Sequence, residues 1–497
     1  MIKEWQLNIM SLLQLKNGNF LNLKNNKSKF FLDSAIVNSA SLIEKFFFFI
    51  ATIIVARYLS IEHFGEFSTA LSYATFFSAI TDIGINISLI RAINLENKYE
   101  NEHFTNAFCL KVTLAVIVYL FMAFSLYCTG YNYDVIKLIL ILGLVRIGNE
   151  FMTTYYAADE AKRNFIFPAI INSIYVVIFF ISVVFVIVLH GNYYHISIAR
   201  LIVVYLFVFL LSIRTFKKFT IIFNKNIFVK FVKSVIPFSL ISIFWNFTFK
   251  INPLIISFIS GTTYVGLFNN ALMFIDTISL IPDNLRKVIM PTLYKTLEEN
   301  DMGKFQFIFD TMSKYLGITS FYIMIIFYLF AKNIIYLIFG SKYKEAIPVL
   351  QILSFALPMV FNVASITIVG MDKQKILLRI LMISTMINII SNITLISLFG
   401  VIGSAMSVVI TYGVIYYSGH LYLYKKENIK IKLILLTYGK LILITIILIS
   451  SYNLYFKYVF NELISALIIT ILYIMLILIM LFSKDDIRII KEMLQIT

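Results

Sequence analysis

The chain has 497 residues, of which 60% are hydrophobic and only 14% are charged, and its mean hydropathy is +0.88. A soluble protein of this length needs about a quarter of its residues charged to cover its surface, so the composition excludes that class and indicates a polytopic membrane protein. The formal net charge of +16 does not indicate nucleic-acid binding, because the basic residues lie mostly in alternate short loops between apolar segments.

Fourteen apolar segments, each near the ~20 residues that cross a bilayer, predict fourteen transmembrane helices. They start near Phe31, Phe67, Phe104, Val135, Phe165, His195, Phe231, Tyr264, Met312, Ala346, Lys375, Val401, Lys432 and Asn461. Three lysines within residues 24–29 precede the first segment, and the loops after the even-numbered segments are basic, which places both chain ends in the cytoplasm. One outward loop, with Lys332, Lys342 and Lys344, departs from this charge pattern.

The segments around Gly65 and Gly266 repeat each other. In chain order, Gly65, Phe67, Ala70, Leu71, Ser78, Ile80 and Asp82 align with Gly266, Phe268, Ala271, Leu272, Ser279, Ile281 and Asp283. Six spans separate the copies, and because this number is even, both copies cross the membrane in the same direction. The repeat therefore predicts an all-α membrane protein with two parallel six-helix bundles. The expected parts are a cytoplasmic N-terminal segment at 1–30, bundles at 31–214 and 231–424, a cytoplasmic linker at 215–230, two C-terminal helices within 425–482, and a cytoplasmic tail at 483–497.

Polar side chains line up on single helical faces in the repeat-related spans one, two, seven and eight, which favours a shared central cavity. The candidate cavity residues are Lys45, Lys250, Arg200, Asn38, Asn246, Trp245 and Asn269. Lys250 has no acidic residue within one turn of its own helix, so it is the first candidate for holding a substrate anion. For Lys45 and Arg200 a structural role is an open alternative.

Three acidic residues inside the spans, Asp82, Asp276 and Asp283, are candidates for a gate or for ion coupling. Asp82 and Asp283 lie toward the cytoplasmic ends of their spans, so helix-end salt bridges to Arg91 or Arg286 are the alternative.

Other features of the spans have a structural interpretation beside the functional one. Arg146 and Glu150 are four residues apart on one helix and are expected to neutralise each other. Pro237, Pro253 and Pro282 interrupt spans seven and eight, and both a hinge and a static kink remain open.

Several segments resemble those of bacterial polysaccharide exporters. Residues 53–93, IIVARYLSIEHFGEFSTALSYATFFSAITDIGINISLIRAI, resemble their first two spans. The segments YVGLFNNALMF, LIPDNLRKVIMPTL, GSKYKEAIPVLQIL and NIISNITLISLFGVIGSAMSVVIT resemble their eighth and their tenth to twelfth spans. The chain is thus similar, through most of residues 30–425, to the O-antigen unit flippases of the multidrug/oligosaccharidyl-lipid/polysaccharide exporter superfamily, whose fold is MATE-like.

This resemblance implies a flippase of the bacterial inner membrane. Its substrate would be a polyprenyl-diphosphate-linked oligosaccharide unit of O-antigen, capsule or a related surface glycan, carried to the outer leaflet by alternating access. Lys45, Lys250 and Arg200 would meet the diphosphate, whereas Trp245 and the polar stripes would meet the sugars. Two residues depart from the family pattern: Ser60 replaces a usual Gly, and Asn252 stands where relatives often carry Asp, so a carboxylate role there is absent or moved to Asp276.

The alternatives are a lipid II flippase with the same fold and a cation-coupled multidrug antiporter, which would need an acidic cavity. A membrane-embedded glycosyltransferase or ligase would need large outward loops, and the outward loops here are short, so we expect no enzyme. Cys109 and Cys128 lack metal-site spacing, and no metal or other cofactor is expected. An ion gradient or the membrane potential would drive transport. The expected partners are membrane lipids, a glycan polymerase and a chain-length regulator, and no nucleic acid.

Overall fold

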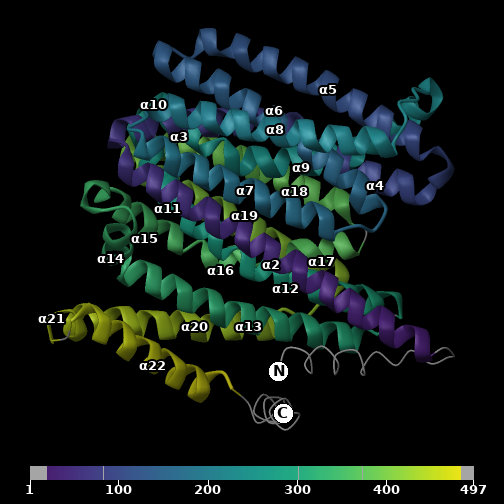
Figure 1. The fold of residues 1–497 in the computed structure, drawn as a ribbon. Helices are drawn as coiled ribbons and strands as arrows, with labels where there is room; N and C mark the ends of the chain where they lie inside the picture. The colour runs from purple at the N-terminus through teal and green to yellow at the C-terminus, as the bar shows by residue number, and fades with distance from the viewer. Residues whose placement is uncertain (1–19, 82, 300, 372, 460, 483–497) are drawn as a thin grey trace.

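The computed structural model describes residues 20–81, 83–299, 301–371, 373–459 and 461–482, and every regular element in these ranges is helical (Figure 1). The α-helices are α2 (Phe20–Tyr58), α3 (Ile61–Thr81), α4 (Ile85–Leu95), α5 (Glu100–Ser125), α6 (Tyr133–Ala161), α7 (Ile166–Val188), α8 (Tyr193–Lys218), α9 (Lys225–Lys250), α10 (Asn252–Ile259), α11 (Thr262–Ile278), α12 (Leu280–Glu298), α13 (Met302–Leu329), α14 (Ala331–Ile338), α15 (Ala346–Ser354), α16 (Leu357–Val360), α17 (Ala364–Gly370), α18 (Gln374–Phe399), α19 (Val401–Glu427), α20 (Lys432–Ser451), α21 (Lys457–Val459) and α22 (Glu462–Met480).

Within the described residues, 12 helices are long and apolar enough to cross a membrane, and one bent pair of helices makes a thirteenth candidate. Each of the fourteen predicted spans starts inside a helix or at its N-cap. The predicted fourth span coincides with α6, a helix of 29 residues that carries Lys137, Arg146 and Glu150 and is not among the 12. The chain is therefore a polytopic all-α membrane protein, while the number of fourteen spans stays a prediction.

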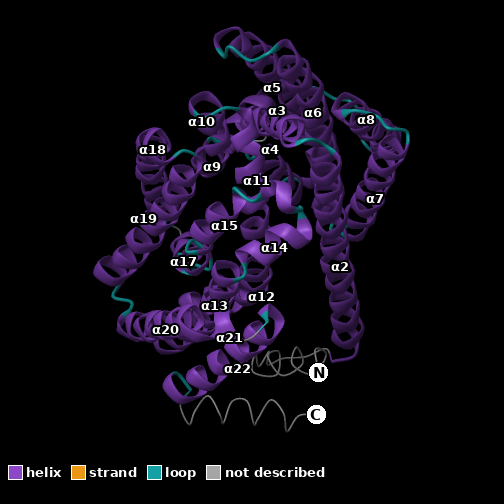
Figure 2. Ribbon diagram, turned by 90° about the vertical axis from the view of Figure 1, so that its left-hand side faces the viewer, coloured by secondary structure: helices purple, strands orange, loops and turns teal. Residues whose placement is uncertain are grey.

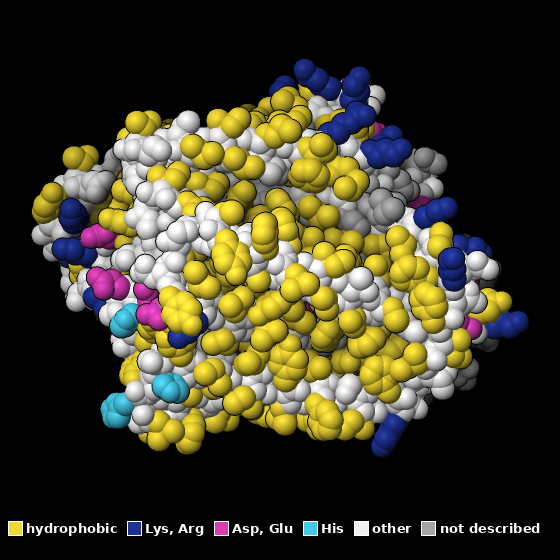
Figure 3. All heavy atoms as spheres, turned by 90° about the horizontal axis from the view of Figure 1, so that it is seen from above, with side chains coloured by type: hydrophobic (Ala, Val, Ile, Leu, Met, Phe, Trp, Pro, Cys, Tyr) yellow, Lys and Arg dark blue, Asp and Glu magenta, His cyan; other side chains and the backbone are white. Residues whose placement is uncertain are grey.

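The surface agrees with a membrane environment. Seen from above, the molecule presents a broad hydrophobic face, with Lys and Arg side chains gathered toward its two ends (Figure 3). Exposed large apolar side chains such as Phe185, Phe209 and Leu467 are 62–64% accessible. Lipid tails solvate such side chains, whereas water would not.

Three helix ends differ from the predicted boundaries by several residues. α8 continues to Lys218 and α9 begins at Lys225, so residues 219–224 alone connect the two helices. Asn224 ends this connection because its side chain accepts hydrogen bonds from the backbone N–H groups of Asn226 and Ile227, which caps α9. At the other end, α2 begins at Phe20, inside the predicted N-terminal segment.

The helices pack in two sets that have the same order of neighbours. In the first, α2 contacts α7, α7 contacts α8, and α6 contacts both α3 and α8. In the second, α9 contacts α18, α18 contacts α19, and α15 contacts both α11 and α19. α3 and α11 begin at Ile61 and Thr262, which are separated by the same 201 positions as Gly65 and Gly266. The packing thus follows the sequence repeat. α20 and α22 lie outside both sets, against α13 (Figure 2).

The two sets meet where α3 packs against α11. A Cβ atom at Gly65 would lie 2.6 Å from the carbonyl oxygen of Thr262 and 2.6 Å from Cα of Thr263, so glycine is required for this approach. Further along the same pair of helices, Asn269 donates a hydrogen bond to Ser72 at 3.0 Å. The opening residue of the repeat therefore lies where the backbones of its two copies approach each other closely.

Reciprocal cation contacts tie the two sets together at the end of the molecule where α2 ends and α3 begins. Arg57 donates from Nε to the carbonyl of Ile338 at 2.8 Å, and a second guanidinium nitrogen donates to the carbonyl of Leu337. Lys342 donates from Nζ to the carbonyls of Arg57 at 3.0 Å and Leu59 at 2.5 Å. Each cation meets the C-terminal carbonyls of a helix in the other set, where the helix dipole favours positive charge. The contact gives Lys342, in the loop that departs from the charge pattern, a structural reason to be basic.

Three predicted spans are discontinuous. α9 and α10 are separated at Ile251, with Pro253 in the first turn of α10, and α11 and α12 are separated at Ser279. The predicted tenth span is divided into α15, α16 and α17, and its two parts are bent by 46°. The prolines of spans seven and eight predict the first two interruptions, whereas the third is not among the predictions, although Pro358 marks it.

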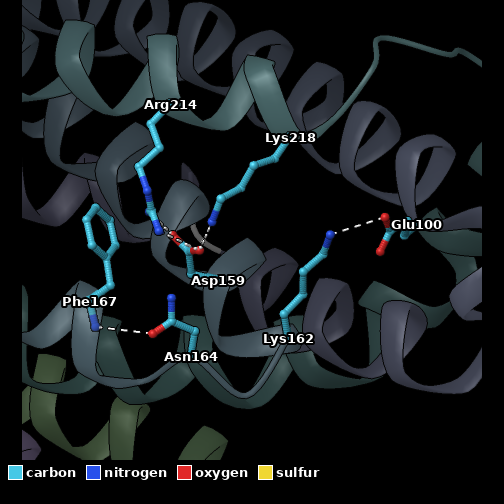
Figure 4. A network of polar contacts seen from close by, with 7 residues as sticks. All are labelled: Glu100, Asp159, Lys162, Asn164, Phe167, Arg214 and Lys218. Atoms are coloured by element: carbon cyan, nitrogen blue, oxygen red, sulfur yellow. Dashed lines mark hydrogen bonds and ion pairs between the residues drawn. The ribbon is translucent and has the colours of Figure 1, made fainter.

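A polar network holds the ends of α5, α6, α7 and α8 together (Figure 4). Asp159 of α6, whose side chain is only 8% accessible, pairs with Arg214 and, at 2.8 Å, with Lys218 of α8. The guanidinium carbon of Arg214 lies 3.1 Å from the ring centre of Phe167. Because one buried carboxylate serves two cations, its role here is to hold the helices together.

We expect Asp159→Asn to lower stability, because both cations would lose their counter-charge. The side chains of Arg214 and Lys218 are 29% and 38% accessible, so solvent screens part of the loss. A cost of about 1–3 kcal/mol follows for a hydrogen-bonded charged group. Thermal unfolding in detergent, followed by size-exclusion chromatography, measures it. Glu299→Gln is the matched control, since its pair with Lys295 is long (3.6 Å) and open to solvent. Equal melting temperatures for the two variants would contradict the assigned role.

Candidate functional site

A cavity of about 390 Å³ lies within the second set of helices. Ligand pockets typically have volumes of about 300–1,000 Å³, so this cavity is large enough for a small ligand or for one part of a larger one. Its lining comes from α9, α11, α18, α19 and the interrupted tenth span: Trp245, Asn246, Phe249, Lys250, Asp276, Ser279, Met359, Val360, Asn362, Ser365, Ile366, Val369, Leu377, Tyr412 and Ile415. Four of the predicted site residues therefore meet at one place: Trp245, Asn246, Lys250 and Asp276.

One wall of the cavity is aromatic. The rings of Phe249 and Tyr412 are stacked, with centroids 4.4 Å apart and planes at 23°. Trp245 meets Phe249 edge-on at 5.5 Å, and 41% of Trp245 is accessible. Rings that pack on one another hold their positions, so the wall exists before any ligand binds. Next to it, Asn246 donates from Nδ2 to the carbonyl of Ser242 at 2.9 Å.

The charged part of the cavity combines both signs. Lys250 is the last residue of α9, directly before the break at Ile251, and Asp276 on α11 is accessible from the cavity. Asp276 interacts electrostatically with Lys250 and also with Lys45 of α2, which belongs to the first set of helices. The break thus places a cation near the middle of the span Leu240–Ile259 and close to a carboxylate. A lysine and a carboxylate in one cavity both offer charge-assisted hydrogen bonds to a ligand.

Glu44 and Lys45 point to different sides of α2, as neighbours on a helix do. Glu44 is hydrogen-bonded to Asn172 of α7 and so bonds within its own bundle. Lys45 is exposed and interacts with Asp276 across the interface between the two sets. Asn38 is exposed on the same helix.

Arg200 and Asn269 lie outside the cavity. Arg200 is only 5% accessible and is held in the first set, with its guanidinium 4.8 Å from the ring centre of Phe179. Asn269 forms the hydrogen bond to Ser72 between the two sets, so it stabilises the interface. Asn269 occupies an interior polar position, which is what the stripe pattern detects, whereas Arg200 is a candidate because it is a basic residue inside a span. The pattern does not distinguish side chains that line a cavity from side chains at an interface between helices.

The predicted gate residues are incompletely described. Asp82 lies outside the described residues, and Asp283 belongs to α12, after the break at Ser279, with a side chain that is not described. Asn252, which replaces a carboxylate of the related exporters, is buried and accepts a hydrogen bond from Asn392 at 2.8 Å. Asn252 therefore has no carboxylate role, and Asp276 is the acidic residue that lines the cavity.

Two groups of residues are not among the residues predicted from the sequence. The first is the bend of the tenth span, where Asn362 accepts a hydrogen bond from the N–H of Ala364 at 2.7 Å and lines the cavity. The second is Lys111 of α5, which forms an ion pair with Glu150 at 2.7 Å. Glu150 also interacts electrostatically with Arg146, as their four-residue spacing predicts, while Arg200 repels Arg146. Lys111 comes from another helix, so spacing along α6 does not reveal it.

The side chains that could bind a metal ion do not form clusters in the described part of the chain. Among the described residues, no group of three or more His, Cys, Asp or Glu side chains lies close enough together to hold a metal ion. The polar chemistry of the cavity therefore rests on one lysine, one carboxylate, amides and hydroxyls.

Known structures with low sequence identity share this fold. The lipid II flippase MurJ in an inward closed conformation is similar over 90% of this chain and 98% of its own, with a TM-score of 0.74 and 16% identity. A multidrug resistance MATE family transporter of the MOP superfamily, in an inward-facing conformation, is similar over 78% of this chain and 96% of its own, with a TM-score of 0.64 and 13% identity. At these identities the likeness concerns the fold.

Sequence relatives give the family. An uncharacterized membrane protein of Methanocaldococcus jannaschii is 29% identical over 206 residues, and the match spans 38% of this chain and 41% of that relative. The family model described as "Polysaccharide biosynthesis protein" matches residues 32–297, which is more than half of the chain and includes α3 and α11 of the repeat. The chain therefore belongs to the polysaccharide biosynthesis protein family.

Proposed function

We propose that this protein is a flippase that moves a polyprenyl-diphosphate-linked oligosaccharide unit from the cytoplasmic to the outer leaflet of the bacterial inner membrane. The observation that carries the proposal is the cavity, in which Lys250 and Asp276 lie beside aromatic and amide side chains inside a membrane-spanning fold. A diphosphate and its sugars cannot enter hydrocarbon, so they need such a polar interior, while the prenyl tail can stay in lipid.

The transport cycle would be alternating access between the two repeated sets of helices. Both termini would face the cytoplasm, which puts the Arg57 and Lys342 contacts at the outer side of the membrane. In this arrangement the contacts close the outer side, and the substrate enters from the cytoplasmic leaflet. The protein would act as a transporter and not as an enzyme, with an ion gradient or the membrane potential as energy source. A glycan polymerase and a chain-length regulator would use the product.

Two other transport functions share the fold. MurJ is by its name a lipid II flippase, and the MATE protein is by its name a multidrug resistance transporter. A cationic drug would be attracted by Asp276 but repelled by Lys250 and Lys45, which interact with the same carboxylate. An O-antigen or capsule unit is favoured over lipid II because the family is described by polysaccharide biosynthesis.

The proposal is tested with the purified protein in liposomes that contain a fluorescent polyprenyl-diphosphate glycan. We expect the protein to increase the rate at which the labelled lipid becomes accessible to a membrane-impermeant quencher at the other leaflet. Lipid II and the cation ethidium are the comparison substrates. Transport of lipid II at an equal rate would favour the lipid II flippase, and transport of ethidium alone would favour the antiporter.

A further inference from the structure

Two positions that line the cavity differ chemically from the equivalent positions in the first half of the chain. The offset of 201 positions that aligns Gly65 with Gly266 also aligns Lys45 with Asn246 and Glu44 with Trp245. The first half thus has two charged residues where the second half has an aromatic ring and an amide. Since the two halves share a fold, this difference points to two kinds of recognition in one substrate path.

The second half has the groups that recognise a sugar ring. A pyranose presents apolar C–H groups on its faces and hydroxyl groups around its edge. The wall of Trp245, Phe249 and Tyr412 offers a rigid apolar surface for a face. Asn246, Asp276 and Ser279 line the same cavity and offer donors and acceptors for the edge.

The charges lie beside this wall. Lys250 is one residue after Phe249, at the end of α9, and Lys45 of the first half interacts electrostatically with Asp276. A lipid-linked glycan carries its diphosphate directly next to its first sugar. A ligand with one sugar on the aromatic wall would therefore present its diphosphate to the two lysines without crossing the cavity.

We propose that the aromatic wall of Trp245, Phe249 and Tyr412 is a sugar-binding subsite that takes the diphosphate-linked sugar of the glycan and sets which glycans are accepted. The proposal rests on the proposed function, because it assigns part of that substrate to these residues. It assigns specificity to the second half of the chain and anion binding to Lys250 and Lys45, the two lysines that interact electrostatically with Asp276.

Tryptophan fluorescence tests the subsite directly, because the chain has two tryptophans, Trp5 and Trp245. In the full-length Trp5→Phe variant in nanodiscs, Trp245 is the single reporter. The probes are polyprenyl diphosphate bearing glucose, galactose, N-acetylglucosamine or N-acetylgalactosamine, and polyprenyl diphosphate without sugar. We expect a saturable fluorescence change with at least one glycosylated probe that binds at least tenfold tighter than the bare lipid.

A second variant separates the sugar contribution from the anion contribution. Tyr412→Ala should weaken binding of the preferred glycosylated probe at least tenfold and change binding of bare polyprenyl diphosphate less than twofold. Tyr412→Leu, which keeps an apolar side chain without a ring, should behave the same if the wall acts through its rings. Tyr424→Ala is the matched control, because Tyr424 lies on the same helix and is 53% exposed.

The outcomes distinguish the two proposals. If glycosylated and bare lipids bind equally, and Tyr412→Ala changes neither, the sugar subsite is wrong although the flippase proposal survives. If none of the diphosphate lipids binds to the unsubstituted protein, the proposed function itself fails.

Discussion

Lys250→Ala should reduce flipping about 10- to 100-fold while leaving membrane insertion normal. Lys250 lines the cavity at the end of α9, next to the break at Ile251. Hydrogen bonds to a charged group contribute roughly 1.5–3 kcal/mol, and each 1.4 kcal/mol is about a factor of ten. The liposome assay measures the rate, and Lys250→Arg should keep most of it, because the charge remains. Lys304→Ala is the control, since that lysine is exposed in the first turn of α13.

A double variant decides what Lys250 does. Asp276 interacts with Lys250, so Lys250→Ala also removes a counter-charge from a carboxylate. If neutralising Asp276 were its whole role, Lys250→Ala combined with Asp276→Asn would restore transport. If Lys250 holds the substrate anion, the double variant stays as slow as Lys250→Ala alone. We expect the second result. Full transport by Lys250→Ala, or full rescue by the double variant, would rule out the anion-binding role.

Gly65→Ala should open the contact between the two sets of helices. The new Cβ would meet the backbone of Thr262 and Thr263 at 2.6 Å, and backbone atoms cannot rotate away as a flexible side chain can. Overpacking of this kind costs about 1–3 kcal/mol, so the closed arrangement should lose population by roughly tenfold. Each set keeps its own packing, and we therefore expect normal expression with impaired transport.

Cysteine labelling measures this opening. Cys109 and Cys128 are first replaced by serine, because both are free and Cys128 is exposed. A reporter at Ser72→Cys, where the native side chain contacts Asn269, should then react about tenfold faster with a maleimide in the Gly65→Ala background. Gly439→Ala is the matched control, since a Cβ added at this position of α20 would have no neighbour within 4 Å. Equal labelling rates in both backgrounds would contradict a closing role for Gly65.

Much of the site is predictable because the spacing of residues along a helix determines which of them share a face. Asn246 and Lys250 share a face of α9 and both line the cavity, as their four-residue spacing predicts. Trp245 reaches the cavity from the neighbouring position of the same helix. Asp276 is a candidate for a gate or for ion coupling because it is an acidic residue inside a span. These residues depend on periodicity and on the cost of charge in lipid, and both are properties of the sequence.

Other positions needed the fold. Asn269 has the same polar character as Asn246, yet it bonds to Ser72 in the facing helix and lies outside the cavity. Tyr412 is one of many aromatic residues in the chain, and its stacking on Phe249 unites residues that are 163 positions apart. Neither partner can be inferred from spacing along one helix, because the register between two packed helices is set by all of their side chains together.

The amino-acid sequence by itself determined that the chain is a membrane protein, which segments are helices, that two halves are related, and which family it resembles. Composition, periodicity and the repeat suffice for this, since a lipid environment forces each span to satisfy its own backbone. Tertiary structure alone decided that Lys250 lies near Asp276, that Lys342 meets the end of α2, and that the tenth span bends into the cavity. These are contacts between distant segments, and they depend on how whole helices pack.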